Sequence, residues 1–187
     1  MRMVLDACVL FPNVMRSVLL AVAKTGAFEP IWSPRLLEEW RRAALRHSPE
    51  LEIVAATEIA LLALHWPGAK RSDVSDLAQF WLPDPNDVHV LALAVDQKAQ
   101  GIITANAKDF PRHILAEYGL SRADPDGLLC GFAEANPGPV QQAVLSVVAQ
   151  GTDPTAPKSA RAFLKKARLP RLGKWVEQAE DADHPNH

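Results

Sequence analysis

The chain has 187 residues, 48% of them hydrophobic, which suits one globular domain of ordinary size with room for an appendage. Its formal net charge of -2 excludes a globally basic nucleic-acid-binding protein, so a polyanionic partner has to be bound by a local patch or a metal ion. The two cysteines have no spacing typical of a disulfide framework or a zinc site. No apolar run is long enough to cross a membrane, and the acidic residue Asp6 comes too early for a secretory signal. We therefore expect a cytoplasmic protein.

The first predicted element is a short buried strand at residues 3–5, which ends at Asp6. A helix follows, because apolar residues recur at helical spacing from Asn13, a candidate cap, until Gly26. Arg16 lies near the start of this helix. It is a candidate for contacting a substrate phosphate or an acidic cluster, and the alternative is an ordinary surface arginine.

A second short strand is predicted at residues 28–32, followed by a helix that begins at Ser33-Pro34 and contains Glu39. Ser48-Pro49 begins the next helix. Serine caps the first turn with its side chain, and proline suits the first helical position because no N–H is needed there. Glu39 is either a functional acid or a solvated residue paired with Arg42 or Arg46.

A fourth helix is predicted to begin at Asp84-Pro85, with Asp87 three residues after the cap. Apolar residues at helical spacing after Asp87 indicate that this helix packs against the rest of the protein. Asp84 is interpreted mainly as a capping residue, and Asp87 as a functional acid that also favours the helix dipole. His89 is predicted to be a surface or packing residue, like His113.

Residues 101–104 predict a further strand, because β-branched apolar residues follow a glycine. Thr104, Asn106 and Asp109 lie in the loop after it. Helices are then predicted at residues 111–118 and after Asp124-Pro125.

The alternation of strands and helices predicts an α/β fold with a central parallel sheet covered by helices. Functional sites of such folds lie at the carboxyl ends of the strands. The composition changes near residues 136–139, so we predict one domain at residues 1–133 and a helical C-terminal extension at residues 134–187. The extension contains a basic run from Lys158 to Lys174, which is either a solvated helix face or a surface for RNA backbone.

Four acids far apart in the sequence are candidates for one site: Asp6, Glu39, Asp87 and Asp109. Each lies where a doubly wound sheet can bring it to the same edge. Carboxylates held together repel one another unless they are protonated or neutralised by a cation. Oxygen ligands suit Mg²⁺ or Mn²⁺, which can lower the pKa of a bound water and stabilise charge on a phosphate.

Four short motifs together resemble a PIN domain, most closely the VapC-type ribonuclease toxins of bacterial toxin–antitoxin pairs. The resemblance extends over residues 1 to about 133. The motifs are Val4-Leu5-Asp6-Ala7, the helix from Trp32 to Trp40, the segment from Leu82 to Val90, and the segment from Ile103 to Pro111.

The resemblance implies a three-layer α/β/α PIN-like fold and a divalent-metal-dependent endoribonuclease that hydrolyses RNA phosphodiester bonds. Its catalytic residues would be Asp6, Glu39, Asp87 and Asp109, with Asp6, Asp87 and Asp109 as the metal ligands for Mg²⁺ or Mn²⁺. Thr104 matches the family's hydroxyl at the edge of the site. Many members carry Asp where this chain has Asn106, so the number of metal ions is open; Arg16, Thr104 and Asn106 are candidates for binding substrate. The expected partners are RNA and a cognate antitoxin, with a homodimer as a candidate assembly.

Two other functions are alternatives for this sequence. The first is a catalytically weak PIN-fold module that binds RNA or a protein, favoured by the missing acid at Asn106. The second is a phosphotransfer protein, which is disfavoured because Asp6-Ala7-Cys8 lacks the second acid of an Asp-x-Asp pair. There is also no glycine-rich loop for a nucleoside triphosphate.

Overall fold

The protein is described here by a computed structural model, which covers residues 1–151 and 159–183. The chain folds into two compact units. The first contains residues 1–11 and 28–123, and the second contains residues 12–27 together with the chain from residue 124 onward. A segment near the N-terminus therefore belongs to the same unit as the C-terminal helices.

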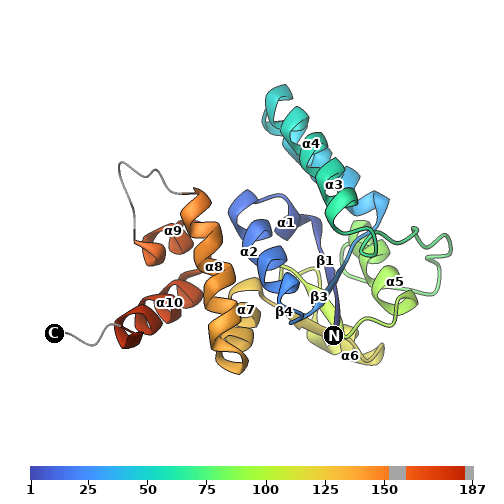
Figure 1. The fold of residues 1–187 in the computed structure, drawn as a ribbon. Coiled ribbons are helices and arrows are strands. Elements are labelled where there is room, and N and C mark those ends of the chain that lie inside the picture. The colour runs from blue at the N-terminus through green and yellow to red at the C-terminus, as the bar shows by residue number, and fades with distance from the viewer. Residues whose placement is uncertain (152–158, 184–187) are drawn as a thin grey trace. The chain divides into compact units, whose positions relative to one another are not determined.

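A four-stranded parallel sheet forms the centre of the first unit (Figure 1). The strand order is β2-β1-β3-β4, and in the two central strands Val4 of β1 pairs with Ile102 of β3. Both side chains are fully buried. The predicted class is confirmed: an α/β fold with a central parallel sheet, followed by a helical C-terminal segment. The strands are β1 (Arg2–Leu5), β2 (Glu29–Ile31), β3 (Gly101–Ile103) and β4 (Ser121–Ala123).

Strand β4 was not predicted, because Ser121-Arg122-Ala123 has no apolar run and is only partly buried. Its position depends on Gly101 of β3. A Cβ atom at residue 101 would collide with the backbone oxygen of Ser121. The two strands can approach each other because residue 101 has no side chain.

Helices of the first unit pack on the sheet and on one another. Helix α5 contacts β1 and β3, α6 contacts β4, and α1 contacts α3. Helices α3 and α4 lie side by side as a hairpin (Figure 1). The elements are α1 (Ala7–Leu10), α3 (Pro34–His47), α4 (Pro49–His65), the 3₁₀ turn η1 (Pro85–Asp87), α5 (Val88–Asp96) and α6 (Arg112–Glu117).

The predicted helix starts are confirmed by the caps. Ser33 Oγ accepts a hydrogen bond from the backbone N–H of Leu36, and Ser48 Oγ accepts one from Leu51. In each case the next residue is the predicted proline at the first helical position. The side chain satisfies an N–H group that the helix itself leaves unpaired.

The predicted cap at Asn13 is wrong. Pro12 occupies the cap position of α2 (Asn13–Lys24), and no side chain caps this helix. Asn13 is instead the first helical residue, and its Oδ1 accepts from Arg16 Nη2 at 3.0 Å. The proline before it supplies an extended backbone but has no side-chain oxygen to accept a bond.

The second unit is a group of helices. Helix α8 contacts α2 and α7, and α10 contacts α7 and α9. The contact grouping places α2 and α7 together with the C-terminal helices, while the predicted boundary between residues 133 and 134 stays a prediction. Besides α2, the helices are α7 (Pro125–Ala135), α8 (Pro137–Gly151), α9 (Ala160–Lys166) and α10 (Pro170–Asp183).

Asp126 of α7 caps the start of α10. Its carboxylate is 7% exposed and accepts from the backbone N–H groups of Arg171 and Leu172, both at 2.9 Å. These N–H groups belong to the first turn of α10, where no intrahelical partner exists. A side chain on one helix therefore caps another helix that is distant in the sequence.

The basic run is partly paired in the structure. Arg161 forms an ion pair with Glu177 at 2.6 Å, and Arg171 forms one with Asp124 at 2.7 Å. Lys158, at the start of the run, lies outside the described residues. At least two of these cations therefore have acidic partners within the protein. Among the described helices, none combines the length and apolar character needed to span a membrane.

Candidate metal centre

Asp6 lies at the junction between β1 and α1, at the carboxyl end of a central strand. Its backbone N–H donates to the Ile103 carbonyl at 3.1 Å, and its own carbonyl accepts from Val9 and Leu10 of α1. The side chain is buried, with 7% exposed. The backbone of Asp6 is therefore held from both sides by the sheet and by the first helix.

Two neighbouring side chains orient the Asp6 carboxylate. Thr104 Oγ1 donates to Asp6 Oδ2 at 2.7 Å, and Cys8 Sγ lies 2.9 Å from the same oxygen. Burial, together with the negative charge of Asp6, raises the pKa of Cys8 to about 12, so the thiol stays protonated and can donate. Thr104, predicted as a substrate-binding residue, thus contacts a site acid directly.

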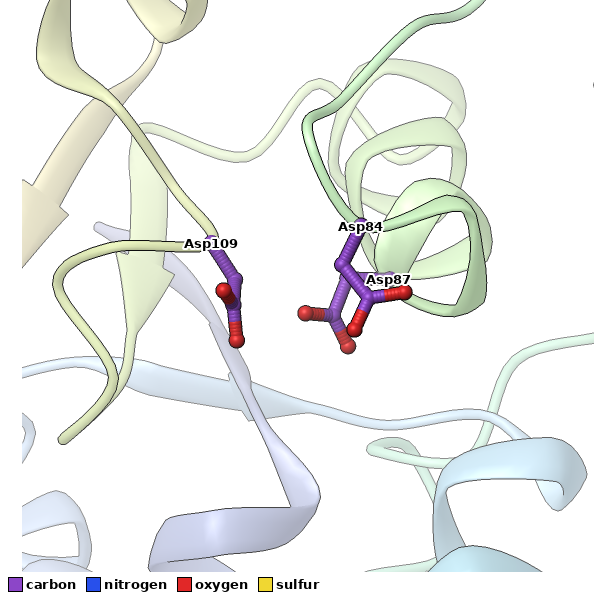
Figure 2. A group of neighbouring side chains, drawn as sticks. All are labelled: Asp84, Asp87 and Asp109. Carbon is purple, nitrogen blue, oxygen red and sulfur yellow. The ribbon is translucent and has the colours of Figure 1, made fainter.

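A tight turn before α5 brings two further acids together. Asp84 caps η1 by accepting from the Asn86 N–H at 2.9 Å, as its sequence context predicts. Asp87 ends η1, and its N–H donates to the Asp84 carbonyl at 3.1 Å. The 3₁₀ turn brings both carboxylates to the start of α5 (Figure 2).

Asp109 comes from the loop after β3. Asn106 Nδ2 makes a short hydrogen bond to Asp109 Oδ2, and the Asn106 N–H donates to Thr104 Oγ1. Asn106, a predicted substrate-binding residue, therefore directs its amide toward an acid of its own loop.

The three carboxylates of Asp84, Asp87 and Asp109 meet. Each offers one oxygen atom, and these oxygens lie within 4.8 Å of one another. Figure 2 shows Asp109 facing Asp84 and Asp87 across a short gap. Sequence reasoning assigned Asp84 mainly to capping and missed that the same side chain would join the cluster.

The pKa of Asp87 reflects both the burial of this side chain and the negative charge of the acids around it. Burial, together with the negative charges of Asp6, Asp109, Asp84 and Glu39, raises the pKa of Asp87 to about 7. All four predicted catalytic acids are thus brought to one region of the first unit. A carboxyl group in such surroundings is stabilised by a proton or by a cation.

Glu39 on α3 lies at the edge of this cluster. Its Oε1 is 2.8 Å from His89 Nε2 and 3.4 Å from Arg35 Nε. The alternative partner considered for it, Arg42, pairs instead with Glu38. Hydrogen bonds from Arg41 and Arg42 lower the pKa of Glu38 to about 2, so the ionised Glu38 is balanced by two arginines of its own helix.

The interpretation of His89 as an unremarkable surface or packing residue is incomplete. It is only 4% exposed, and it contacts a predicted catalytic acid. A histidine in an otherwise apolar helical stretch was the available signal. Arg16 is likewise buried, at 3% exposed, rather than a surface arginine; it belongs to the second unit, and its role in binding substrate stays a prediction.

The donors present fit a hard divalent cation. Asp84, Asp87 and Asp109 offer only carboxylate oxygens, the ligand type that Mg²⁺ and Mn²⁺ prefer. Burial and the repulsion of neighbouring acids raise the pKa of Asp87. A divalent ion between these oxygens would remove that repulsion.

Comparison with known proteins places this arrangement in a family. The family model of the PIN domain matches residues 2–108, more than half of the chain. The chain belongs to the PIN-domain family. The family predicted from the four motifs is therefore confirmed. The PIN-domain match contains Asp6, Glu39 and Asp87 and ends one residue before Asp109.

The sequence is also similar to that of a named bacterial protein. The chain is 32% identical over 92 residues to the Mycobacterium tuberculosis protein named "Putative ribonuclease VapC50". The similarity covers 49% of this chain and 50% of the relative, so the chain spans about half the length of the curated relative it matches. No solved structure matches the chain.

Proposed function

We propose that this PIN-domain protein is a divalent-metal-dependent endoribonuclease and the toxin of a type II toxin–antitoxin pair. The main observation behind the proposal is the acidic cluster around Asp87, because carboxylates that lie so close together repel one another unless a cation or a proton neutralises them. Membership in the PIN family and similarity to a protein named as a ribonuclease support RNA as the substrate.

In this proposal Asp6, Asp87 and Asp109 hold Mg²⁺ or Mn²⁺, as the resemblance to PIN domains implies. Asp84 joins them because its carboxylate lies close to those of Asp87 and Asp109. When bound, the ion would lower the pKa of a water molecule and stabilise negative charge on the scissile phosphate. Thr104 holds the Asp6 carboxylate in place through its hydroxyl.

Glu39 has a different task, since it lies beside His89 and Arg35 at the edge of the cluster. We assign it to orienting the attacking water, either directly or as a ligand through water. Arg16, Thr104 and Asn106 remain candidates for contacting the RNA.

The proposal is tested with Asp6→Asn and Asp87→Asn, which keep the side-chain shape and remove the charge. We expect each to reduce RNA cleavage in Mg²⁺ or Mn²⁺ by more than about 100-fold, because even residues that only orient metal ligands contribute about 10- to 100-fold. The matched control is Asp96→Asn, an exposed aspartate at the far end of α5. Equal cleavage by the parent and the two site variants would show that the activity belongs to another site or to a contaminant.

A second candidate function is favoured by Asn106. This residue adds no charge at a position where many PIN domains have an acid, and its amide is used in a bond to Asp109. The protein would then be a catalytically weak module that binds RNA or a protein. RNA binding that is equal with and without divalent ions, together with no cleavage under either condition, would favour this function.

The partners are part of the same proposal. We expect a small antitoxin to bind over the acids and block them and the cytoplasm to be the location, with a homodimer as a candidate assembly. Co-expression with the product of a neighbouring small reading frame, followed by measurement of the mass in solution, tests both assemblies.

A further inference from the structure

His89 is a polar side chain in an apolar part of the protein. It lies in the first turn of α5, directly after Asp87 and Val88. Its neighbours Val90 and Leu91 are fully buried, and His89 itself is 4% exposed. Burying an imidazole without hydrogen bonds is unfavourable, whereas an apolar residue could fill the same volume without that penalty.

The contact that accounts for this histidine is with Glu39. His89 Nε2 lies 2.8 Å from Glu39 Oε1. Among the described residues, neither ring nitrogen has a hydrogen-bond partner with aligned geometry. A small rotation of the ring or of the half-exposed carboxylate aligns the N–H with Oε1, because the two atoms are already at hydrogen-bond distance.

The same contact links Glu39 to the acidic cluster. His89 and Asp87 are two residues apart at the start of α5, so the helix backbone fixes the distance between them. Glu39 comes from α3, and its charge acts on Asp87. The other basic residue beside Glu39 is Arg35, which is more distant at 3.4 Å and is 42% exposed, so solvent weakens that ion pair.

We propose that His89 is a positioning residue for Glu39. It donates from Nε2 to Glu39 Oε1 and holds this carboxylate beside Asp87, so that α3 and α5 present their acids in one fixed arrangement. Both the neutral ring with a proton on Nε2 and the doubly protonated ring can make this bond. The inference rests on the proposed function in one respect: the arrangement matters for cleavage only if Glu39 serves that reaction.

Two substitutions separate positioning from packing. His89→Gln keeps an N–H donor within reach of the Nε2 position, and His89→Leu keeps an apolar volume without any donor. His113→Leu, at an exposed histidine of α6, is the matched control. We expect His89→Leu to reduce kcat for RNA cleavage about 10- to 100-fold with little change in KM, and His89→Gln to restore most of the loss.

The melting temperature distinguishes a positioning role of His89 from a packing role, because only a packing role predicts that His89→Leu loses stability. Leucine needs no hydrogen bond in the buried site, and the Glu39 side chain is 33% exposed and can bond to water instead. The loss of the proposed bond is therefore largely offset, and His89→Leu is expected to melt close to the temperature of the parent or above it. A loss of kcat without a loss of stability points to positioning. If Leu and Gln variants lose equal activity, or if activity falls only as far as stability falls, His89 is a packing residue and the proposal is overturned.

A double-mutant cycle with Glu39→Gln shows whether His89 acts through Glu39. If it does, His89→Leu has little further effect on kcat or on the affinity for Mn²⁺ once Glu39 has been changed, since coupled residues are not additive. Fully additive effects contradict the proposal.

The same cycle is measured on urea unfolding, which does not depend on any enzymatic activity. Coupling between the two substitutions is expected there as well, and its absence overturns the proposed bond. If the parent neither cleaves RNA nor binds Mn²⁺, the proposed function fails, and the unfolding cycle still decides separately whether His89 and Glu39 form a bonded pair.

Discussion

At the scale of single residues, the pKa of the Asp87 carboxyl group depends on the acids around it. Burial and four neighbouring acids raise its pKa from 3.8 to about 7. Below pH 7 the group in the metal-free protein holds a proton, while the same group in the unfolded chain loses its proton near pH 4. The folded state therefore binds more protons than the unfolded state across this range.

The pH dependence of stability follows from this difference. The contribution of Asp87 is fully present below its unfolded pKa of 3.8 and is lost as the pH rises through about 7. We expect Asp87→Asn to raise the melting temperature of the metal-free protein at pH 8, by roughly 2–4 °C, and to change it less at pH 5. Thermal unfolding of both proteins in a chelator measures this. An equal shift at the two pH values would contradict the raised pKa.

Metal binding has the opposite pH dependence, because a ligand must lose its proton first. The affinity for Mn²⁺ is expected to rise about tenfold per pH unit up to pH 7 and to level off above it. Calorimetric titration between pH 5.5 and 8 shows whether one proton is released for each ion bound below pH 7. Asp96→Asn should leave this profile unchanged.

At the scale of elements, the loop between β3 and α6 is held by Arg122 of β4, the strand that the sequence did not predict. Arg122 on β4 donates from Nη1 to the Ala107 carbonyl at 2.5 Å and to the Phe110 carbonyl at 3.0 Å. These two carbonyls lie on either side of Asp109. The strand therefore braces the segment that brings Asp109 to the cluster.

Removal of this brace is expected to loosen the loop. Arg122→Met keeps the length of the side chain and removes its donors, so amide hydrogen exchange at residues 105–110 should become faster and the affinity for Mn²⁺ should fall about tenfold. The comparison is Arg112→Met, at an exposed arginine of α6. Unchanged exchange in the loop would mean that its own hydrogen bonds suffice.

At the scale of the whole molecule, one helical unit is assembled from two distant parts of the chain. Helix α2 packs with α7 and α8, and Val18 and Val22 of α2 are fully buried, as are Val140 and Val144 of α8. The predicted boundary between residues 133 and 134 would separate α2 from these partners in α8.

Truncation tests that boundary. A chain that ends at residue 133 exposes the apolar side chains of α2 that α8 covers, and each buried valine contributes about 1.5–3 kcal/mol. We therefore expect it to melt at least roughly 10 °C below the full chain, or to aggregate. If the shortened chain keeps the melting temperature and the dispersed amide spectrum of the full chain, residues 134–187 are an independent extension.

Much of the architecture could be predicted because the signals are local. A serine or aspartate before a proline predicted the starts of α3, α4, η1 and α7, since a cap needs only the next few residues. Short apolar runs predicted β1, β2 and β3. The polar edge strand β4 had no such signal, because its place depends on pairing with β3.

The candidate site divides in the same way. The sequence by itself determined that Asp6 follows a strand, that Asp87 lies at the start of a helix and that Asp109 lies in the loop after a strand, and so that they could share one edge of a parallel sheet. Only the tertiary structure decided that Asp84 joins them and that His89 meets Glu39. Those contacts join segments that are far apart in the sequence, such as Glu39 and His89, which are 50 positions apart, and backbone hydrogen bonding within one helix or strand does not specify them.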